Sequence, residues 1–330
     1  MTVEELVGAQ LVVGLPGTQL TPEVADHLRA VHAGGFIAFA RNFTSSEQFR
    51  ALVAQIRQAV DRDALVMVDH EGGRVVRFSS GVTPFPDALT VGAHDSPEWV
   101  AQQGAIEAKE LRALGVDVNL APCVDVLVEG ADPIIGTRSY GSDPHRVASL
   151  GAARIQGSQR QGLMMCAKHF PGIGAVPKDP HKQLSAVELD WSAMRAIHLV
   201  PFVEAIKVGV ATIMSSHVCY PKLEPAPQTP ATCSTRLMHD LLRGELGFQG
   251  VTVSDDLEMG ALRELTSIGE AAVRAVAAGH DLLLVCSDLD AQRAVCQALC
   301  AAYRSGRLSV AGLEESVARI THLQRTFRGR

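Results

Sequence analysis

The sequence reads Gly162-Leu163-Met164-Met165-Cys166-Ala167 and continues as Lys168-His169-Phe170-Pro171-Gly172. The first part is an apolar run with the length of a strand that is buried on both faces. Two basic side chains end this run, and a turn rich in proline and glycine leads on to Asp179 and His181. The pattern predicts a buried strand that presents Lys168 and His169 at its end. The loop beyond it carries a carboxylate and an imidazole, which are groups suited to proton transfer.

Seven further apolar runs resemble this one, and together the eight runs define the fold class. They cover residues 10–17, 35–41, 65–72, 116–126, 163–172, 211–218, 250–257 and 280–287. Most lack strict alternation of polar and apolar residues, as is typical of parallel strands. The turn Gly14-Leu15-Pro16-Gly17 does not match the phosphate-binding turn of a doubly wound open sheet, which is the alternative architecture.

Segments with helical periodicity lie between these runs. Thr21, Ser45 and Ser96 are placed to cap helices that start at about residues 22, 46 and 97, the last ending near Gly115. Further helices are expected over roughly 145–161, 191–208, 235–246, 267–278, 290–305 and 311–326. Eight strands, each followed by a helix, predict a (β/α)8 TIM barrel, and we expect one domain over residues 1–330.

Composition excludes several classes of protein. The chain has 330 residues, of which 47% are apolar and 20% charged, so a sizeable core is expected. The net charge of −6 and the lack of a long basic run argue against nucleic acid as a partner. No signal peptide or 18-residue apolar span is apparent, and the seven cysteines suit free thiols, so we expect a cytoplasmic protein without membrane contact. No Cys/His spacing typical of zinc sites occurs, and we expect no metal and no cofactor.

Polar side chains follow five consecutive predicted strands. The third ends in Asp69 with Arg77 beyond it, and the fourth ends in Asp125 with Arg138 in its loop. The fifth, sixth and seventh end in Lys168-His169, Ser215-Ser216-His217 and Ser254-Asp255-Asp256. The carboxyl ends of all strands of a barrel meet at one rim, where active sites are built. The sequence therefore predicts a catalytic rim, the alternative being polar ends that only pair with one another.

Two of these features together suggest displacement at a carbon atom. Asp255 at a strand end could be a fixed carboxylate nucleophile, or it could simply cap the next helix. His181 could protonate a leaving group while Asp179 orients its ring, or the two could be an exposed loop pair. A carboxylate nucleophile and a general acid are the minimum for a retaining glycosidase.

Six sequence motifs resemble those of glycoside hydrolase family 3, in particular its bacterial NagZ-type β-N-acetylglucosaminidases, over nearly the whole chain. They are Phe39-Ala40-Arg41-Asn42-Phe43, the stretch from Val68-Asp69-His70-Glu71-Gly72-Gly73-Arg74 to Phe78, Asn119-Leu120-Ala121-Pro122, Ile135-Gly136-Thr137-Arg138-Ser139-Tyr140, Lys168-His169-Phe170-Pro171-Gly172, and the stretch from Glu245-Leu246-Gly247-Phe248 to Ser254-Asp255-Asp256-Leu257.

The resemblance implies residue roles and a substrate. It implies that Asp255 is the nucleophile and that His181 is the general acid/base with Asp179 as its partner. It implies that the sugar is bound by Asp69, Arg77, Arg138, Lys168 and His169. The expected reaction is the release of terminal β-linked N-acetylglucosamine from peptidoglycan (muropeptide) fragments during cell-wall recycling, by a cytoplasmic enzyme that we expect to be a monomer.

Two departures from the family pattern keep other functions open. Ile173 replaces the second His of the usual Lys-His-Phe-Pro-Gly-His-Gly, and Pro180 replaces the Ser of the usual Asp-Ser-His. The alternatives are a family 3 β-glycosidase for another sugar, a phosphorylase that uses phosphate in place of water, and an inactive sugar-binding barrel. A fourth is an aldolase in which Lys168 forms a Schiff base.

Overall fold

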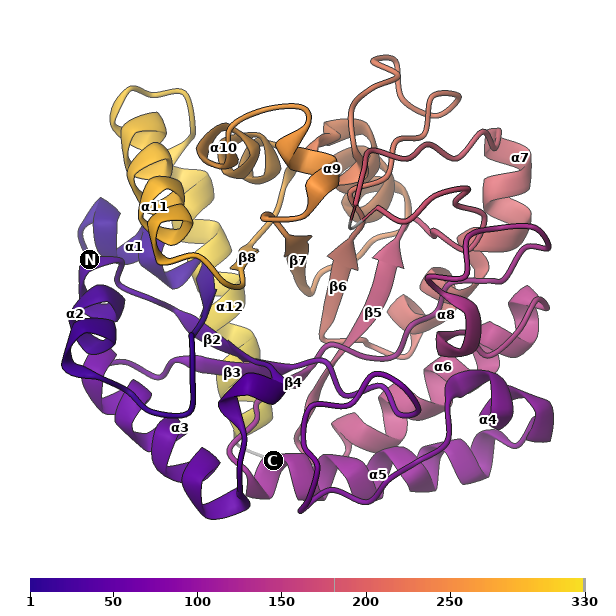
Figure 1. Ribbon diagram of the computed structural model, residues 1–330. Helices are drawn as coiled ribbons and strands as arrows, with labels where there is room; N and C mark the ends of the chain where they lie inside the picture. The colour runs from indigo at the N-terminus through magenta and orange to yellow at the C-terminus, as the bar shows by residue number, and fades with distance from the viewer. Residues whose placement is uncertain (181, 329–330) are drawn as a thin grey trace.

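The computed structural model describes residues 1–180 and 182–328, in which eight parallel strands close into a barrel in chain order (Figure 1). The strands are β1 (Leu11–Gly14), β2 (Gly35–Ala38), β3 (Leu65–Val68), β4 (Val118–Asn119), β5 (Met164–Phe170), β6 (Thr212–Ser215), β7 (Val251–Asp256) and β8 (Leu282–Val285). The last strand closes the barrel onto the first, with Leu283 opposite Leu11. Each strand lies inside its predicted run, so the predicted TIM barrel is confirmed.

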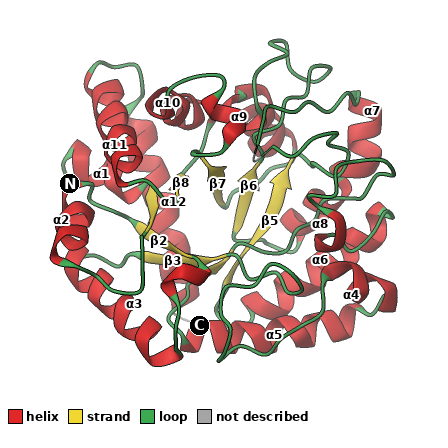
Figure 2. Cartoon of the chain, in the orientation of Figure 1, coloured by secondary structure: helices red, strands yellow, loops and turns green. Residues whose placement is uncertain are grey.

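Helices surround the barrel on its outside (Figure 2). They are α1 (Val3–Ala9), α2 (Pro22–Ala30), α3 (Ser46–Val60), α4 (Ala88–His94), α5 (Pro97–Ala113), α6 (Pro144–Gln159), α7 (Trp191–Ala193), α8 (Val200–Lys207), α9 (Gly260–Arg263), α10 (Ile268–Ala278), α11 (Leu289–Arg304) and α12 (Val310–Arg328). The segment Arg236–Glu245 after β6 is wound as a π-helix. The predicted caps are confirmed, because the hydroxyls of Thr21, Ser45 and Ser96 each accept an N–H from the first turn of α2, α3 and α5.

The helices differ from the predicted ones in two respects. The single helix predicted over 191–208 is divided into α7, a π-helical turn at Met194–His198, and α8. Pro201 explains the restart, because proline lacks an N–H and is tolerated in the first turn of a helix but not inside it. The short helices α1, α4 and α9 were not predicted, since four to seven residues give too few turns for periodicity to be visible.

The core has two layers because both faces of the strands are buried. Side chains such as Val12, Ile37 and Met67 fill the barrel interior, whereas their neighbours, such as Val13 and Val66, pack outward against the helices. This double burial explains why the sequence shows continuous apolar runs without alternation. Within the described part of the chain, none of the helices combines the length and apolarity that a membrane crossing needs.

Candidate active site

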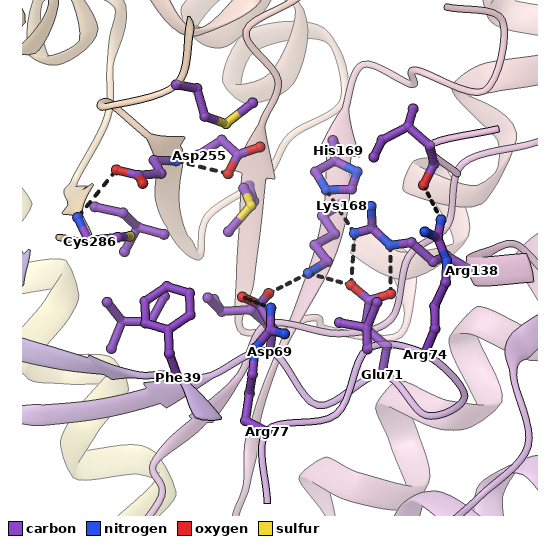
Figure 3. Close-up of a pocket in the computed structure, with 18 residues that line it drawn as sticks. Phe39, Asp69, Glu71, Arg74, Arg77, Arg138, Lys168, His169, Asp255 and Cys286 are labelled. Carbon is purple, nitrogen blue, oxygen red and sulfur yellow. Dashed lines mark hydrogen bonds and ion pairs between the residues drawn. The ribbon is translucent and has the colours of Figure 1, made fainter. Parts of the chain in front are cut away.

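A pocket of about 340 Å³ opens at the carboxyl ends of the strands (Figure 3). Side chains of the barrel interior, Ile37, Leu120, Met214 and Leu284, give it an apolar floor. Its wall is polar and includes Asp69, Glu71, Arg74, Arg77, Arg138, Lys168, His169, Asp255 and Asp256. The pocket is therefore apolar at its base and lined above with hydrogen-bonding groups, a combination typical of small-molecule sites.

Strand periodicity explains why these side chains face the pocket. Side chains two residues apart on a strand point to the same face. In β5, Met164 and Cys166 fill the barrel interior, so Lys168 continues that row upward into the pocket. The same step of two carries Asp69 and Asp255 into the pocket just beyond the interior residues of β3 and β7.

Ion pairs connect the polar groups of the wall. Lys168 Nζ lies 2.6 Å from Asp69 Oδ1 and 2.7 Å from Glu71 Oε1. Arg138 donates to both Glu71 oxygens, at 2.8 and 2.9 Å, and Arg77 Nη2 lies 3.5 Å from Asp69 Oδ2. Burial opposes the charge of Lys168, but the two carboxylates outweigh it and hold the pKa of this amine above its usual value. Lys168 is thus a fixed ammonium ion, poorly suited to forming a Schiff base.

Glu71 and Arg74 were missed as site residues by the sequence reasoning. Burial opposes ionisation of Glu71, but Lys168 and Arg138 outweigh it and hold its pKa below the usual range. Arg74 donates to the carbonyl of Ile134, at 2.5 Å, and so ties the loop after β3 to the loop after β4. Both residues belong to the motif that carries Asp69, so the available signal was their position at or just beyond the end of a predicted strand.

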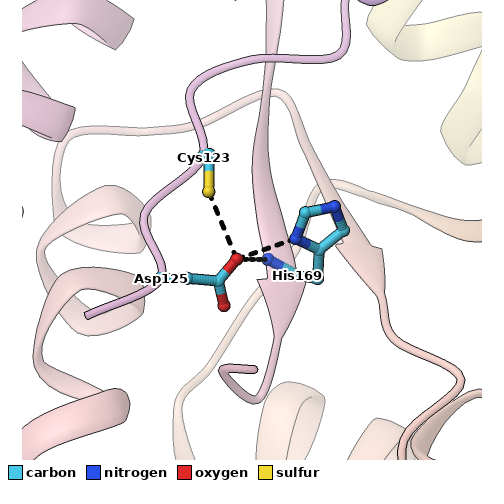
Figure 4. A group of neighbouring side chains, drawn as sticks. All are labelled: Cys123, Asp125 and His169. Atoms are coloured by element: carbon cyan, nitrogen blue, oxygen red, sulfur yellow. Dashed lines mark hydrogen bonds and ion pairs between the residues drawn. The ribbon is translucent and has the colours of Figure 1, made fainter. Parts of the chain in front are cut away.

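His169 is held by Asp125 in a buried group that also contains Cys123 (Figure 4). Asp125 Oδ2 lies 2.7 Å from His169 Nδ1 and 3.2 Å from the His169 backbone nitrogen. Cys, Asp and His are metal-ligating residue types, but these contacts do not suit a metal ion. The carboxylate of Asp125 already accepts the backbone N–H groups of His169 and Ile173 and the Cys123 thiol, which leaves it little capacity to bind an ion.

Two adjacent carboxylates lie at the end of β7. Asp255 Oδ1 accepts the Asp256 N–H at 2.8 Å, and Asp256 Oδ1 accepts the backbone N–H groups of Glu258 and Cys286, at 3.1 and 3.3 Å. The pairing of β7 with β8 shifts register just here, which brings both side chains to the pocket. Burial and the charges of Glu258 and Asp255 raise the pKa of Asp256 to about 7. Asp256 therefore carries a proton over part of the neutral range.

The loop after β5 places Asp179 apart from the pocket wall. Six predicted site residues line that wall, namely Asp69, Arg77, Arg138, Lys168, His169 and Asp255, whereas Asp179 is absent from it in the described ranges 1–180 and 182–328. Asp179 is half-buried, and its carbonyl accepts the N–H of Lys182 at 3.1 Å. His181 lies outside the described residues, so its predicted role stays a prediction.

Both ends of this loop are fixed to neighbouring loops. The carbonyl of Gly174 accepts the Val128 N–H at 3.1 Å, which ties the start of the loop to the segment after β4. The Val187 N–H donates to the Cys219 carbonyl at 2.9 Å, which ties the end of the loop to the segment after β6. The stretch between these anchors includes Asp179.

Comparison with solved structures finds the same architecture in glycoside hydrolases. The structure of a glycoside hydrolase family 3 β-N-acetylglucosaminidase from Paenibacillus matches with a TM-score of 0.97 and 37% identity over 99% of this chain. This chain spans only 63% of that longer protein. NagZ from Neisseria gonorrhoeae, solved in complex with N-trifluoroacetyl-D-glucosamine, matches with a TM-score of 0.78 and 30% identity over 96% of this chain and 98% of its own.

Sequence comparison gives the same result. A beta-hexosaminidase from Stenotrophomonas maltophilia is 38% identical over 282 residues, which cover 84% of this chain and 83% of that protein. One from Nitrosomonas eutropha is 37% identical over 286 residues, 85% of this chain and 81% of its own. The family model described as the glycosyl hydrolase family 3 N terminal domain matches residues 2–323. On these grounds the chain belongs to glycoside hydrolase family 3.

Proposed function

We propose that this glycoside hydrolase is a retaining exo-β-N-acetylhexosaminidase, which releases terminal β-linked N-acetylglucosamine from the non-reducing end of its substrate. The observation that carries the proposal is the pocket, which has a closed apolar floor and Asp255 in its polar wall. A volume of about 340 Å³ suits a single sugar ring rather than a passing chain. A closed floor admits the end of an oligosaccharide and supports removal of one sugar at a time.

The names of the relatives support the choice of sugar. The Stenotrophomonas and Nitrosomonas proteins are beta-hexosaminidases, and the Neisseria structure holds an N-acylated glucosamine. For this chain we assign hydroxyl recognition to the ion-paired group. Asp69 accepts hydrogen bonds from two sugar hydroxyls, Lys168 donates to a ring hydroxyl, and Arg77 and Arg138 hold the acceptors in place.

The reaction proceeds in two steps. Asp255 attacks the anomeric carbon while His181, oriented by Asp179, protonates the departing oxygen, so the glycosidic bond breaks and a glycosyl-aspartate forms. Water then attacks the same carbon as His181 takes a proton from it. The bond to Asp255 breaks, the free carboxylate returns, and the sugar leaves with its original configuration.

The charge balance of the pocket favours water over phosphate as the acceptor. In the described wall, four cationic side chains (Arg74, Arg77, Arg138 and Lys168) face four carboxyl groups (Asp69, Glu71, Asp255 and Asp256). Most of these cations are already paired. Such a pocket suits a neutral sugar and offers little net attraction to an anion. Phosphorolysis is the alternative, and a sugar 1-phosphate formed in phosphate buffer would establish it.

We infer the cellular role from the family resemblance. The substrate is a peptidoglycan fragment that ends in N-acetylglucosamine, and the enzyme acts in cell-wall recycling in the cytoplasm. Residues 1–330 act as one catalytic domain and as a monomer. Mass spectrometry of muropeptides before and after treatment tests the substrate, and the elution volume of the purified chain tests the oligomeric state.

A fluorinated glycosyl donor gives the decisive test of the reaction. A 2-fluoro or 5-fluoro donor should leave a sugar covalently attached to Asp255, and Asp255→Ala should remove turnover. A label on Asp256 or Glu258 would contradict the assignment. Comparing an aryl N-acetyl-β-glucosaminide with the aryl glucoside tests the sugar preference, and turnover of neither would indicate an inactive sugar-binding barrel. His181→Ala should slow substrates with poor leaving groups most.

A further inference from the structure

Asp125 is a buried carboxylate that contacts two parts of the site at once. It is fully buried on the segment after β4, and its Oδ2 faces both the backbone N–H and the ring Nδ1 of His169. Its other oxygen, Oδ1, accepts the N–H of Ile173 at 2.6 Å. Ile173 lies three residues beyond Phe170, the last residue of β5, at the start of the loop that carries Asp179. One side chain thus joins the sugar-binding end of β5 to the start of that loop.

The hydrogen-bond partners determine which ring nitrogen of His169 carries a proton. An ionised carboxylate only accepts hydrogen bonds, so Nδ1 must be protonated where it faces Asp125. On the other side of the ring, Arg138 Nη2 lies 3.3 Å from Nε2, and a guanidinium only donates. Nε2 must then present a lone pair. The backbone N–H groups of His169 and Ile173 also donate to this carboxylate, which favours its ionised form.

We propose that Asp125 is a positioning residue that fixes His169 as the neutral tautomer with the proton on Nδ1 and holds the start of the acid/base loop through Ile173. His169 then presents only an acceptor at Nε2, where Arg138 Nη2 lies at 3.3 Å, so a sugar hydroxyl or amide N–H that donates to Nε2 takes the place of this contact. The part concerning the loop rests on the proposed function. The tautomer of His169 does not, and it is measurable without substrate.

The tautomer is tested first on the unaltered protein. Two-bond ¹H–¹⁵N spectra distinguish a protonated from an unprotonated ring nitrogen, and the loss of signals in His169→Asn assigns them. We expect a protonated Nδ1 and an unprotonated Nε2 at neutral pH. A proton on Nε2 alone, or on both nitrogens, would overturn the tautomer assignment whatever the substrate of the enzyme is.

The positioning role is tested with Asp125→Asn. An asparagine side chain has only one oxygen. If that oxygen accepts the Ile173 N–H, the NH2 group faces the N–H groups of His169, and in the reverse orientation the NH2 group faces the Ile173 N–H. We expect the proton of His169 to move to Nε2, kcat/KM to fall about 100-fold, and amide exchange to accelerate over residues 172–187. The matched control is Asp117→Asn at the opposite end of β4, where Asp117 is also buried and pairs with Arg57 at 2.7 Å. It should lower stability while leaving the His169 tautomer and the loop exchange unchanged.

The outcomes separate this inference from the proposed function. Unchanged tautomer and loop exchange in Asp125→Asn, or the same changes in Asp117→Asn, would overturn it. Failure of the fluorinated donor to label Asp255 would overturn the reaction but not the tautomer. If Asp125→Asn does not fold, exchange in the unaltered protein still decides the loop contact. In that case the Ile173 amide must exchange more slowly than the amides between residues 177 and 184. Equally fast exchange would show that Asp125 does not hold the start of the loop.

Discussion

Lys168 Nζ lies 2.7 Å from Glu71 Oε1, and this ion pair joins the ends of β5 and β3 inside the pocket wall. Both side chains are almost completely buried, with 2% and 5% of their surfaces exposed. A buried charge that loses its partner is strongly destabilised, so each of these groups depends on the other. Glu71 also forms an ion pair with Arg138. This one carboxylate therefore sets the positions of Lys168 and Arg138, two cations that we assign to sugar binding.

Glu71→Gln should therefore impair both activity and stability. The amide cannot balance Lys168 and Arg138, so both cations should shift away from their present geometry. We expect kcat/KM to fall about 10- to 100-fold and the free energy of unfolding to fall by about 3 kcal/mol. Steady-state kinetics and urea unfolding measure the two effects.

Glu107→Gln is the control for this variant. Glu107 is also buried and accepts two hydrogen bonds from Arg154, at 2.7 and 2.9 Å, but it lies outside the pocket wall. It should lose a similar amount of stability while the folded enzyme keeps its kcat/KM. Equal losses of activity in both variants would mean that Glu71 acts only through stability.

The barrel was predictable because its signal is local and repeated. Each strand is a short apolar run, and the step of two along β3, β5 and β7 carries Asp69, Lys168 and Asp255 to one rim. Glu71 lies two residues beyond Asp69 and also faces the pocket, but it was not predicted as a site residue because a carboxylate at a strand end does not by itself reveal its partners. Its role depends on contacts with Lys168 and Arg138, which lie far away in the sequence.

The broken helix before β6 was missed for a related physical reason. Residues 191–208 have helical periodicity throughout, and a change from α- to π-helical winding hardly alters that pattern. Pro201 carried the available signal, since proline marks the first turn of a helix rather than its middle.

Gly174→Ala should detach the start of the loop after β5, which carries Asp179. A Cβ at this position would lie 1.8 Å from the carbonyl oxygen of Val126, so one of the two backbones must move. We expect kcat/KM to fall and amide exchange to accelerate around residue 174. Gly17→Ala is the control, because a Cβ there meets no atom within 4 Å. Unchanged exchange in Gly174→Ala would show that the two loops are not held together by this contact.

Asp256→Asn should change how stability depends on pH. The pKa of Asp256 is raised from 3.8 to about 7, so the folded state binds this proton more tightly than the unfolded state. The free energy of unfolding must then decrease as the pH rises from about 4 to about 7, by about 4 kcal/mol at most. Asparagine resembles the protonated acid and does not titrate, so the variant should become more stable relative to the parent as the pH rises from 5 to 8.

Urea unfolding of both proteins at pH 5 and pH 8 measures this difference, in which the titration of groups far from Asp256 cancels. Asp240→Asn, at an exposed position on the π-helix after β6, serves as the control and should show a much smaller change. A stability difference that stays constant with pH for Asp256→Asn would mean that Asp256 is ionised throughout this range.

Ile173→His restores the residue of the usual family motif and should nevertheless destabilise the protein. Ile173 is 3% exposed and belongs to the hydrophobic core, so an imidazole there would be buried among apolar side chains. Burying an uncompensated polar group costs about 1–3 kcal/mol. We expect that loss in urea unfolding with no gain in kcat, whereas Ile173→Leu, which conserves volume, should cost less than about 1.5 kcal/mol. A histidine variant with unchanged stability and faster turnover would show instead that position 173 contributes to the reaction, and that the isoleucine reduces the activity of this enzyme.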